Sequence, residues 1–177
     1  MPGKFDCAVI RPATLADLPA LVEIHNHYVT STHITFDIEP FTVESRRTWF
    51  DSHNDGKRYR IVVAENEGVI LGSACSGPHR TKAAYNTTVE TSIACRLDAR
   101  GHGLGTLLYR ALFAELIDQD VHRLVAGVAQ PNDASNALHR KLGFAPLGTF
   151  SQVGRKFGKY WDVAWFEADL AAVTGRH

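Results

Sequence analysis

The chain has 177 residues, of which 45% are hydrophobic and 21% charged, and nineteen basic side chains balance nineteen acidic ones. This length and composition predict one globular domain over residues 1–177, with its core over about 8–170. No run of lysine or arginine is present, so no nucleic-acid partner is expected. No apolar stretch could cross a bilayer and no signal peptide is visible. We therefore expect no membrane partner and a cytoplasmic location.

The cysteines and histidines do not predict a metal site. Cys7, Cys75 and Cys95 lie far apart and form no CxxC pair, which indicates reduced, core-filling thiols. His25 and His27 fall in a helical pattern, where residues two apart point to nearly opposite faces. Since no HExxH motif or cysteine cluster is present, no metal is expected.

The first forty residues predict a strand, a helix and an irregular connection. The strand covers residues 7–13, and the helix covers 14–29 with Thr14 as its cap. Residues 31–40 are a polar and aromatic connection that ends at Pro40. One face of the predicted helix carries Leu15, Leu18, Leu21, Val22 and His25.

The middle of the chain changes from helical to strand-like patterns. A second helix is predicted over 42–53, capped by Thr42. The tripeptide "NEG" at 66–68 separates two apolar runs and indicates a hairpin. The predicted strands of this region are 58–65, 69–78 and 87–95.

The last third alternates helices and strands. Leucine recurs every four residues in the helix predicted over 104–117, which marks one buried face. A helix over 132–144 is capped by Asn132 or Asp133 and ends at Gly143. Strands are predicted at 122–129, 147–154 and 160–170. The order βααβββαβαββ indicates a mixed α/β or α+β domain.

The stretch "LDARGHGLGTLL", residues 97–108, places a glycine-rich turn before the leucine helix. Glycines let backbone N–H groups approach an anion, and a helix N-terminus carries partial positive charge. Gly101, Gly103 and Gly105 can therefore form a nest for a phosphate, with Arg100 adding charge. A tight turn without a ligand is an equally open interpretation. No Gly-Lys-Ser/Thr follows, so it is not a Walker loop.

A polar stripe marks the helix that follows. Asn132, Ser135 and His139 are spaced to share one face of this helix. On spacing alone, a solvated surface explains this stripe better than a binding face does.

Together these stretches resemble the GNAT superfamily of acetyl-CoA-dependent N-acetyltransferases. Arg100, Gly103 and Gly105 fit its R-x-x-G-x-G motif, and "NDASNALHRKLGF" is similar to its second cofactor-side segment. "IRPATLADLPALVEIHNHYVTST", "TFDIEP", "AYNTTVETSI" and "VGRKFGKYWDV" resemble the phosphinothricin N-acetyltransferase family, which also acts on methionine sulfoximine and sulfone. The resemblance covers roughly residues 8–170.

This resemblance implies a mixed central sheet of about seven strands flanked by about four helices. The sheet would be splayed between its fourth and fifth strands, with acetyl-CoA in the opening. The implied cofactor contacts are Ser92, Ile93, Ala94, Arg100, Gly101, His102, Gly103, Leu104, Gly105, Asn132 and Ser135. The implied contacts to a small amino-acid-like amine are His79, Arg80, Thr81, Val89, Glu90 and Thr91. The family's "SVYV" reads "SIAC" here, so Ala94 replaces a tyrosine.

Acetyl transfer to an amine assigns candidate roles to several of these residues. Glu90 is the expected general base, because a half-buried carboxylate has a raised pKa; a solvent-facing glutamate is the alternative. Backbone N–H groups near Ile93 and Ala94 can stabilise an oxyanion. His139 is expected either to donate a proton to the departing thiolate or only to contact the cofactor.

Other functions remain open on the sequence. A CoA-binding regulator would keep the glycine turn and would not need Glu90. An enzyme for polyamines or protein N-termini is a second alternative, although Arg80 favours an anionic substrate. The aromatic stretches "TFDIEP" and "KFGKYWD" suggest a homodimer interface, as the resemblance also implies; they could instead close the domain's own core.

Overall fold

The computed structural model describes residues 8–53 and 57–175. Its strands form one seven-stranded sheet in the order β1-β2-β3-β4-β5-β7-β6. The strands are β1 (Val9–Pro12), β2 (Ile61–Asn66), β3 (Val69–Pro78), β4 (Thr88–Cys95), β5 (Arg123–Ala129), β6 (Ala145–Lys156) and β7 (Lys159–Asp169). The α-helices in the described ranges are α1 (Leu18–Ser31), α2 (Arg47–Ser52), α3 (Leu104–Leu116), α4 (Asp133–Lys141) and α5 (Leu170–Thr174). The predicted mixed α/β class and seven strands are confirmed. The prediction on Cys7 lies outside the described residues.

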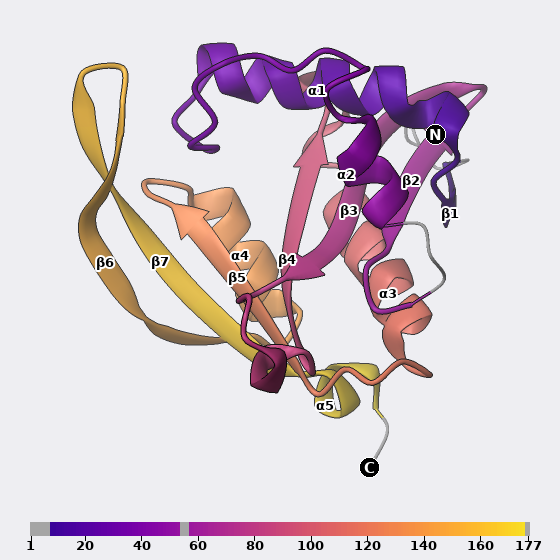
Figure 1. Ribbon diagram of the computed structural model, residues 1–177, viewed down its shortest axis with the longest axis vertical. Helices are drawn as coiled ribbons and strands as arrows, with labels where there is room; N and C mark the ends of the chain where they lie inside the picture. Colours follow the sequence, from indigo (N-terminus) through magenta and orange to yellow (C-terminus); the bar gives the residue numbers. More distant parts are fainter. Residues whose placement is uncertain (1–7, 54–56, 176–177) are drawn as a thin grey trace.

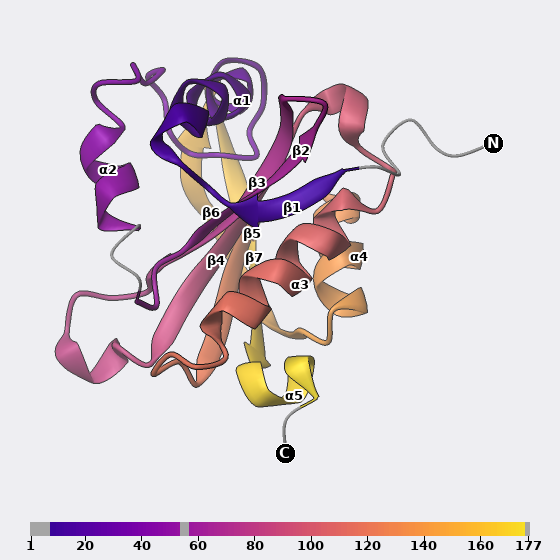
Figure 2. The same ribbon diagram turned by 90° about the vertical axis from the view of Figure 1, so that its right-hand side faces the viewer.

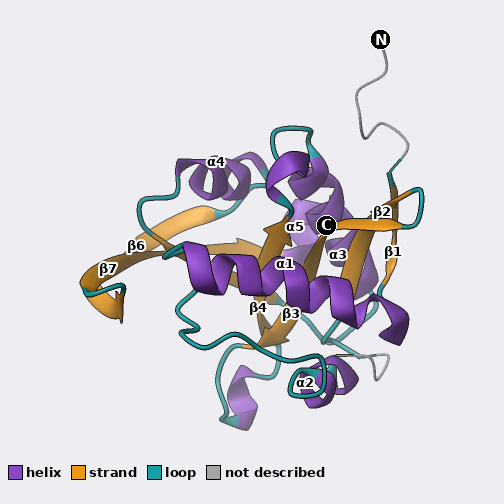
Figure 3. Ribbon diagram, turned by 90° about the horizontal axis from the view of Figure 1, so that it is seen from above, coloured by secondary structure: helices purple, strands orange, loops and turns teal. Residues whose placement is uncertain are grey.

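The helices cover both faces of the sheet (Figure 1). Figure 2 shows α1 and α2 on one side and α3 and α4 on the other, and Figure 3 shows α1 lying across its face. Alternation along β2 explains this arrangement: Val62 packs in the cluster that contains α3, and Val63 packs under α1 and α2. The apolar part of β2, residues 61–64, lies between two helical layers and is therefore buried on both faces.

The leucine repeat of α3 forms the centre of the larger core. Its four leucines, spaced four residues apart, are at most 2% exposed: Leu104, Leu108, Leu112 and Leu116. Residues three and four apart share one face of a helix, and this face lies against β2, β3 and β4. The predicted helix is confirmed, ending one residue earlier than expected.

Two N-terminal predictions were wrong in detail. Leu15 lies in a 3-10 turn, Leu15–Asp17, and is 41% exposed, so it does not join the buried face of α1. The second helix begins at Arg47 and does not begin at the predicted residue 42. Thr42 Oγ1 accepts from the N–H of Ser45, and Ser45 Oγ accepts from the N–H of Thr42, at 3.0 Å each. These side-chain bonds hold a turn where the pattern predicted a helix.

Candidate active site

Among the described residues, β4 and β5 form the one parallel strand pair of the sheet, and all other neighbouring strands are antiparallel. These two strands are in register only over Thr88–Glu90, opposite Arg123, Leu124 and Val125. Beyond this point they diverge (Figure 1). The hydroxyl of Thr91 donates to the carbonyl of Val125 at 3.3 Å, directly after the last pair. The expected separation of the fourth and fifth strands is therefore present, and Glu90 belongs to the last paired position.

The phase of the β3–β4 ladder decides which backbone groups of β4 face this separation. The N–H of Arg96 donates to Leu71 on β3, and antiparallel pairs bond at every second residue. The N–H of Ala94 therefore points to Ser73 on β3, whereas the N–H of Ile93 points to the β5 side. Of the two predicted oxyanion donors, only Ile93 has its N–H directed to the region where the strands part.

The side chains of β4 are divided between the two faces. Val89 and Thr91 are buried in the layer that contains α3, at 0% and 3% exposure. Any contact they make with a substrate is a main-chain contact. Glu90, Ser92 and Ala94 lie on the opposite face, where Ser92 Oγ is 3.0 Å from the Sγ of Cys75.

The glycine turn before α3 contains two residues that require glycine. Gly101 and Gly103 have φ angles of +82° and +79°, and Gly103 is the N-cap of α3. A Cβ atom on either would meet no atom within 4 Å. Both glycines are exposed, as are Arg100 and His102. The first N–H groups of a helix lack intrahelical acceptors, so this turn presents positive potential on an open surface.

Gly105 has a packing role in addition to its predicted place in the cofactor site. It lies inside α3, and a Cβ there would be 2.9 Å from Leu138 Cδ2 on α4 and 3.5 Å from Ile93 Cδ1 on β4. The absence of a side chain at Gly105 allows α3 to pack closely on α4. Gly101 and Gly103 are therefore the exposed glycines of the turn, and Gly105 follows them in the first turn of α3.

The predicted polar stripe of α4 is hydrogen-bonded within the chain, with His139 buried and Asn132 and Ser135 half-buried. Asn132 is confirmed as the N-cap: its side-chain oxygen accepts from the N–H of Ser135 at 3.2 Å. His139 Nδ1 donates to the carbonyl of Ser135 at 2.8 Å, and its Nε2 is 3.1 Å from the hydroxyl of Tyr109. Because a carbonyl can only accept, Nδ1 carries the proton and Nε2 accepts from Tyr109. The His139 ring is 2% exposed, and burial lowers its pKa.

Glu90 has the environment expected of a base. Its pKa is raised, mainly by burial, and this rise is opposed by His79 and Arg80. His79 Nδ1 lies 3.8 Å from the Glu90 carboxylate, beyond hydrogen-bond distance. Arg80 and Thr81 are exposed at the start of the loop between β3 and β4. The predicted base and two of its predicted neighbours, His79 and Arg80, therefore come together at one end of β4.

Trp165 on β7 joins this group, although no sequence motif indicated it. Its ring lies 6.1 Å from the ring of His79, and it packs over Gly127, whose Cβ would be 3.2 Å away. The Trp165 Nε1 and the His79 Nδ1 are buried atoms without a hydrogen-bond partner in the part of the chain that the structure describes. The alternation of β7 could have placed Trp165 on this face, but its proximity to His79 depends on the sheet order.

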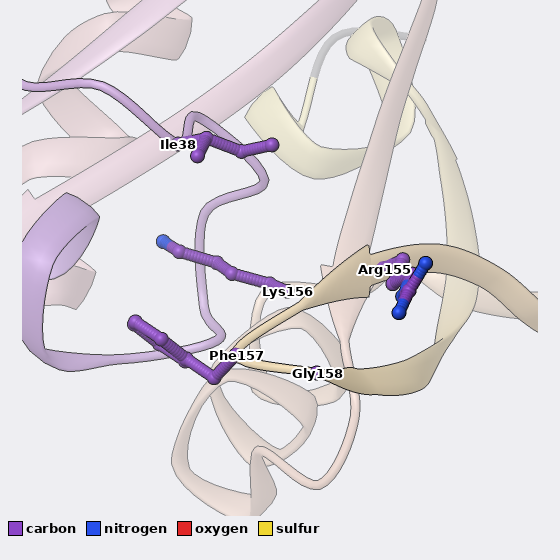
Figure 4. A pocket seen from close by; sticks show the side chains of 5 residues that line it. All are labelled: Ile38, Arg155, Lys156, Phe157 and Gly158. Atoms are coloured by element: carbon purple, nitrogen blue, oxygen red, sulfur yellow. The ribbon is translucent and has the colours of Figure 1, made fainter.

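Two cavities lie outside the set of predicted site residues, and Trp165 lines the second of them. One of about 300 Å³ is formed at the β6–β7 hairpin by Ile38, Arg155, Lys156, Phe157 and Gly158. Figure 4 shows the Lys156 side chain extending between Ile38 and Phe157. The other, of about 200 Å³, lies between α4 and the β6–β7 pair. None of the predicted site residues lines either cavity.

The described residues contain no group of three or more potential metal ligands. His25 Nε2 is 2.7 Å from the carboxylate of Asp37, and His27 is exposed. Within the same residues, no helix has the length and apolar character needed to span a membrane.

Comparison with known proteins gives consistent similarities. The profile of the acetyltransferase (GNAT) family matches residues 21–144. The chain is 51% identical over 172 residues to a phosphinothricin N-acetyltransferase of Streptomyces coelicolor, covering 96% of this chain and 100% of that protein. It is 37% identical to an L-methionine sulfoximine/L-methionine sulfone acetyltransferase of Pseudomonas aeruginosa, covering 92% of this chain and 95% of that one. A solved acetyltransferase of Salmonella typhimurium with its cofactor acetyl-CoA superposes with a TM-score of 0.88 at 33% identity, covering 92% and 94% of the two chains.

Proposed function

The chain belongs to the acetyltransferase (GNAT) family, and on this premise we propose that it acetylates the α-amine of a small amino acid with acetyl-CoA as donor. The acceptor class is an amino acid with a tetrahedral phosphorus or sulfur group: phosphinothricin, methionine sulfoximine or methionine sulfone. The observation that carries the proposal is the half-buried carboxylate of Glu90 at the last paired position of β4 and β5. A module that only bound CoA would not need this carboxylate.

The residues of the glycine turn fit the pyrophosphate of the donor. Gly101 and Gly103 combine positive φ, open space at Cβ and the N-terminal end of a thirteen-residue helix. Arg100 adds positive charge beside them, and Asn132 holds the start of α4. When bound, acetyl-CoA supplies the thioester-activated acetyl group.

Glu90 acts on the acceptor amine. An amine is protonated at neutral pH and attacks only after losing a proton. The raised pKa of Glu90 makes its carboxylate a better acceptor for that proton than an ordinary surface glutamate. The N–H of Ile93 is directed to the side where charge would develop on the acyl oxygen.

His139 acts as a positioning residue in this proposal. Its single ring proton is donated to the carbonyl of Ser135, and its other nitrogen accepts from Tyr109. A ring that is 2% exposed and bonded at both nitrogens supports the internal role over proton donation to a thiolate. It ties α4, which begins at Asn132, to α3, which begins at the glycine turn.

The acceptor pocket is proposed next to Glu90. Arg80 can bind an anionic or strongly accepting group with its planar fork of donors. His79 and Trp165 offer two nitrogen atoms that lack hydrogen-bond partners within the described chain. His79 lies 3.8 Å from the Glu90 carboxylate, and the Trp165 ring lies 6.1 Å from the His79 ring. This set of donors suits phosphinate or sulfone oxygens better than a polyamine.

A steady-state assay of thiol release tests the proposal. The kcat/KM should be compared for phosphinothricin, methionine sulfoximine, methionine sulfone, spermidine and a short peptide, in the wild type and in Arg80→Ala. We expect the amino-acid analogues to lead, and the variant to lose about tenfold or more on them, as for a lost charge-assisted bond. Arg110→Ala, at an exposed position of α3, is the matched control. A preference for spermidine or the peptide, or an unchanged Arg80→Ala variant, would contradict this acceptor class.

We also propose that the protein is a homodimer in the cytoplasm. Part of the aromatic surface is used within the chain: Phe36 packs on Gly154, and Trp161 stacks on His33 at 4.2 Å. The side chains left exposed on the β6–β7 arm are Leu147, Phe150, Val153, Phe157 and Tyr160, each 56–60% exposed. A cytoplasmic location is supported by Cys75 and Cys95, which are both free thiols.

A further inference from the structure

Tyr28 on α1 contacts the proposed pyrophosphate-binding arginine. The Nη2 of Arg100 donates to the Tyr28 hydroxyl at 2.7 Å, and the guanidinium carbon lies 5.1 Å from the centre of the Tyr28 ring. The Tyr28 side chain is buried, at 7% exposure, whereas Arg100 is exposed. A rigid aromatic side chain therefore holds one end of a long, flexible one.

The direction of the hydrogen bonds is fixed by the number of protons. The Tyr28 hydroxyl donates its one proton to the carbonyl of Cys95, at the end of β4. Its oxygen is therefore free to accept from Arg100 and cannot donate elsewhere. Because Cys95 belongs to β4 and Tyr28 belongs to α1, these two hydrogen bonds fix the position of the guanidinium group relative to both elements.

The charge of Arg100 stays uncompensated in this arrangement. Within residues 8–53 and 57–175, no carboxylate makes an ion pair with Arg100. A phenol holds a guanidinium through a neutral hydrogen bond and the ring face, so it orients the group without neutralising it. A carboxylate at the same position would orient the group but would also compete with an anionic ligand.

We propose that Tyr28 is a positioning residue that presents Arg100 to the pyrophosphate of the acetyl donor. The proposal rests on the proposed function, because it assumes that the glycine turn receives this pyrophosphate. It also assigns a role to α1, which the sequence motifs of the cofactor site do not include.

Tyr28→Phe tests this role, because it keeps the ring and removes only the hydroxyl. Binding of CoA and of pantetheine, which lacks the pyrophosphate, should be measured by calorimetry. KM and kcat should be measured with acetyl-CoA and acetyl-pantetheine. We expect CoA affinity to fall, and KM for acetyl-CoA to rise, by about fivefold, as for one lost hydrogen bond. The kcat, and all constants for the pantetheine compounds, should stay within about twofold.

A double-mutant cycle makes the assignment specific. Arg100→Ala should weaken CoA binding, and adding Tyr28→Phe to it should cause no further loss, because the two residues act as one unit. Arg100→Lys provides a second probe that leaves Tyr28 intact: its compact ammonium cannot reproduce the planar contact, so CoA binding should fall there too. Thr30→Val, which removes a hydroxyl at an exposed position of the same helix, is the matched control and should match the wild type.

The outcomes separate the two proposals. Equal losses on CoA and pantetheine, or additive effects in the cycle, would show that Tyr28 only supports the fold and would overturn the positioning role. If the wild type neither binds CoA nor transfers acetyl from either donor, the proposed function itself fails. Thermal unfolding of each variant should accompany the binding data, so that a loss of folded protein is recognised.

Discussion

The hydroxyl of Tyr109 donates to Nε2 of His139 across 3.1 Å, and this bond joins α3 to α4 inside the core. Both partners are almost fully buried, at 0% and 2% exposure. Burial therefore favours the neutral form of His139 in the folded state, while a histidine in an unfolded chain titrates near pH 6.5. This difference links the stability of the protein to pH.

The linkage predicts a loss of stability in mild acid. Burial lowers the pKa of His139, so the unfolded chain binds more protons below about pH 6.5 and is favoured as the pH falls. His139→Asn should unfold more easily at pH 7, by about 1–3 kcal/mol, because it breaks the network. Its stability should fall less between pH 7 and pH 5 than that of the wild type.

Denaturant titrations at pH 7, 6 and 5 measure this difference. His27→Asn, at an exposed position of α1, is the control and should retain the wild-type pH dependence. If His139→Asn shows the same slope with pH as the wild type, the buried histidine is not the group responsible.

Glu90→Gln removes the proton acceptor and keeps the shape of the side chain. We expect kcat to fall by about 10²- to 10⁴-fold, the usual contribution of a general base, with CoA binding unchanged by calorimetry. Glu67→Gln, on the exposed β2–β3 turn, should leave turnover unaffected. Turnover close to wild type in Glu90→Gln at both pH 7 and pH 8 would disprove the assignment.

The pH profile tests the role of His79. Glu90 must be ionised to accept a proton, so activity is lost as the pH falls through its raised pKa. His79 opposes this rise, so His79→Phe should move the acidic limb of the kcat/KM profile to higher pH. Phenylalanine preserves ring contacts with Tyr85 and Trp165. An acidic limb that stays in place, or moves to lower pH, contradicts the coupling of His79 to Glu90.

Gly103→Asp introduces a negative charge where the phosphate is expected. CoA affinity should fall about tenfold or more, equivalent to about 1.4 kcal/mol. The matched control is Gly68→Asp: its φ of +81° imposes the same backbone strain as the +79° of Gly103, on the distant β2–β3 turn. A folded Gly103→Asp protein that binds CoA like the wild type would remove the basis of the cofactor site.

The assembly state can be measured directly. Light scattering at micromolar concentration should give the mass of two chains. Phe157→Lys places a charge on the exposed apolar surface of the β6–β7 arm and should shift the mass toward one chain. Lys57→Glu, an exposed position before β2, should leave the mass unchanged. A single-chain mass for the wild type would refute the dimer.

Much of the fold could be predicted from periodicity, because the sequence pattern of most elements agrees with the secondary structure that they form. The leucines of α3 predict their own buried face, and the apolar run of β2 predicts a strand. Where side chains bond the main chain, as Thr42 and Ser45 do, the pattern alone overestimated the helix.

The site was less predictable because it depends on contacts between distant segments. Tyr28 and Arg100 are 72 positions apart, and Trp165 meets His79 only through the sheet order. The direction of the Ile93 N–H depends on the phase of a ladder, which composition does not reveal. His139 had the right spacing for a binding face, but the packing of α4 buries its ring, whereas Asn132 and Ser135 stay half-buried.

The alternation along β4 has a consequence for how such an enzyme can diversify. Val89 and Thr91 lie in the layer beneath α3, while Glu90, Ser92 and Ala94 lie on the opposite face of the sheet. A substitution at one of these three positions can therefore leave the packing beneath α3 intact. Ala94, where the resemblance led us to expect a tyrosine, belongs to this second group.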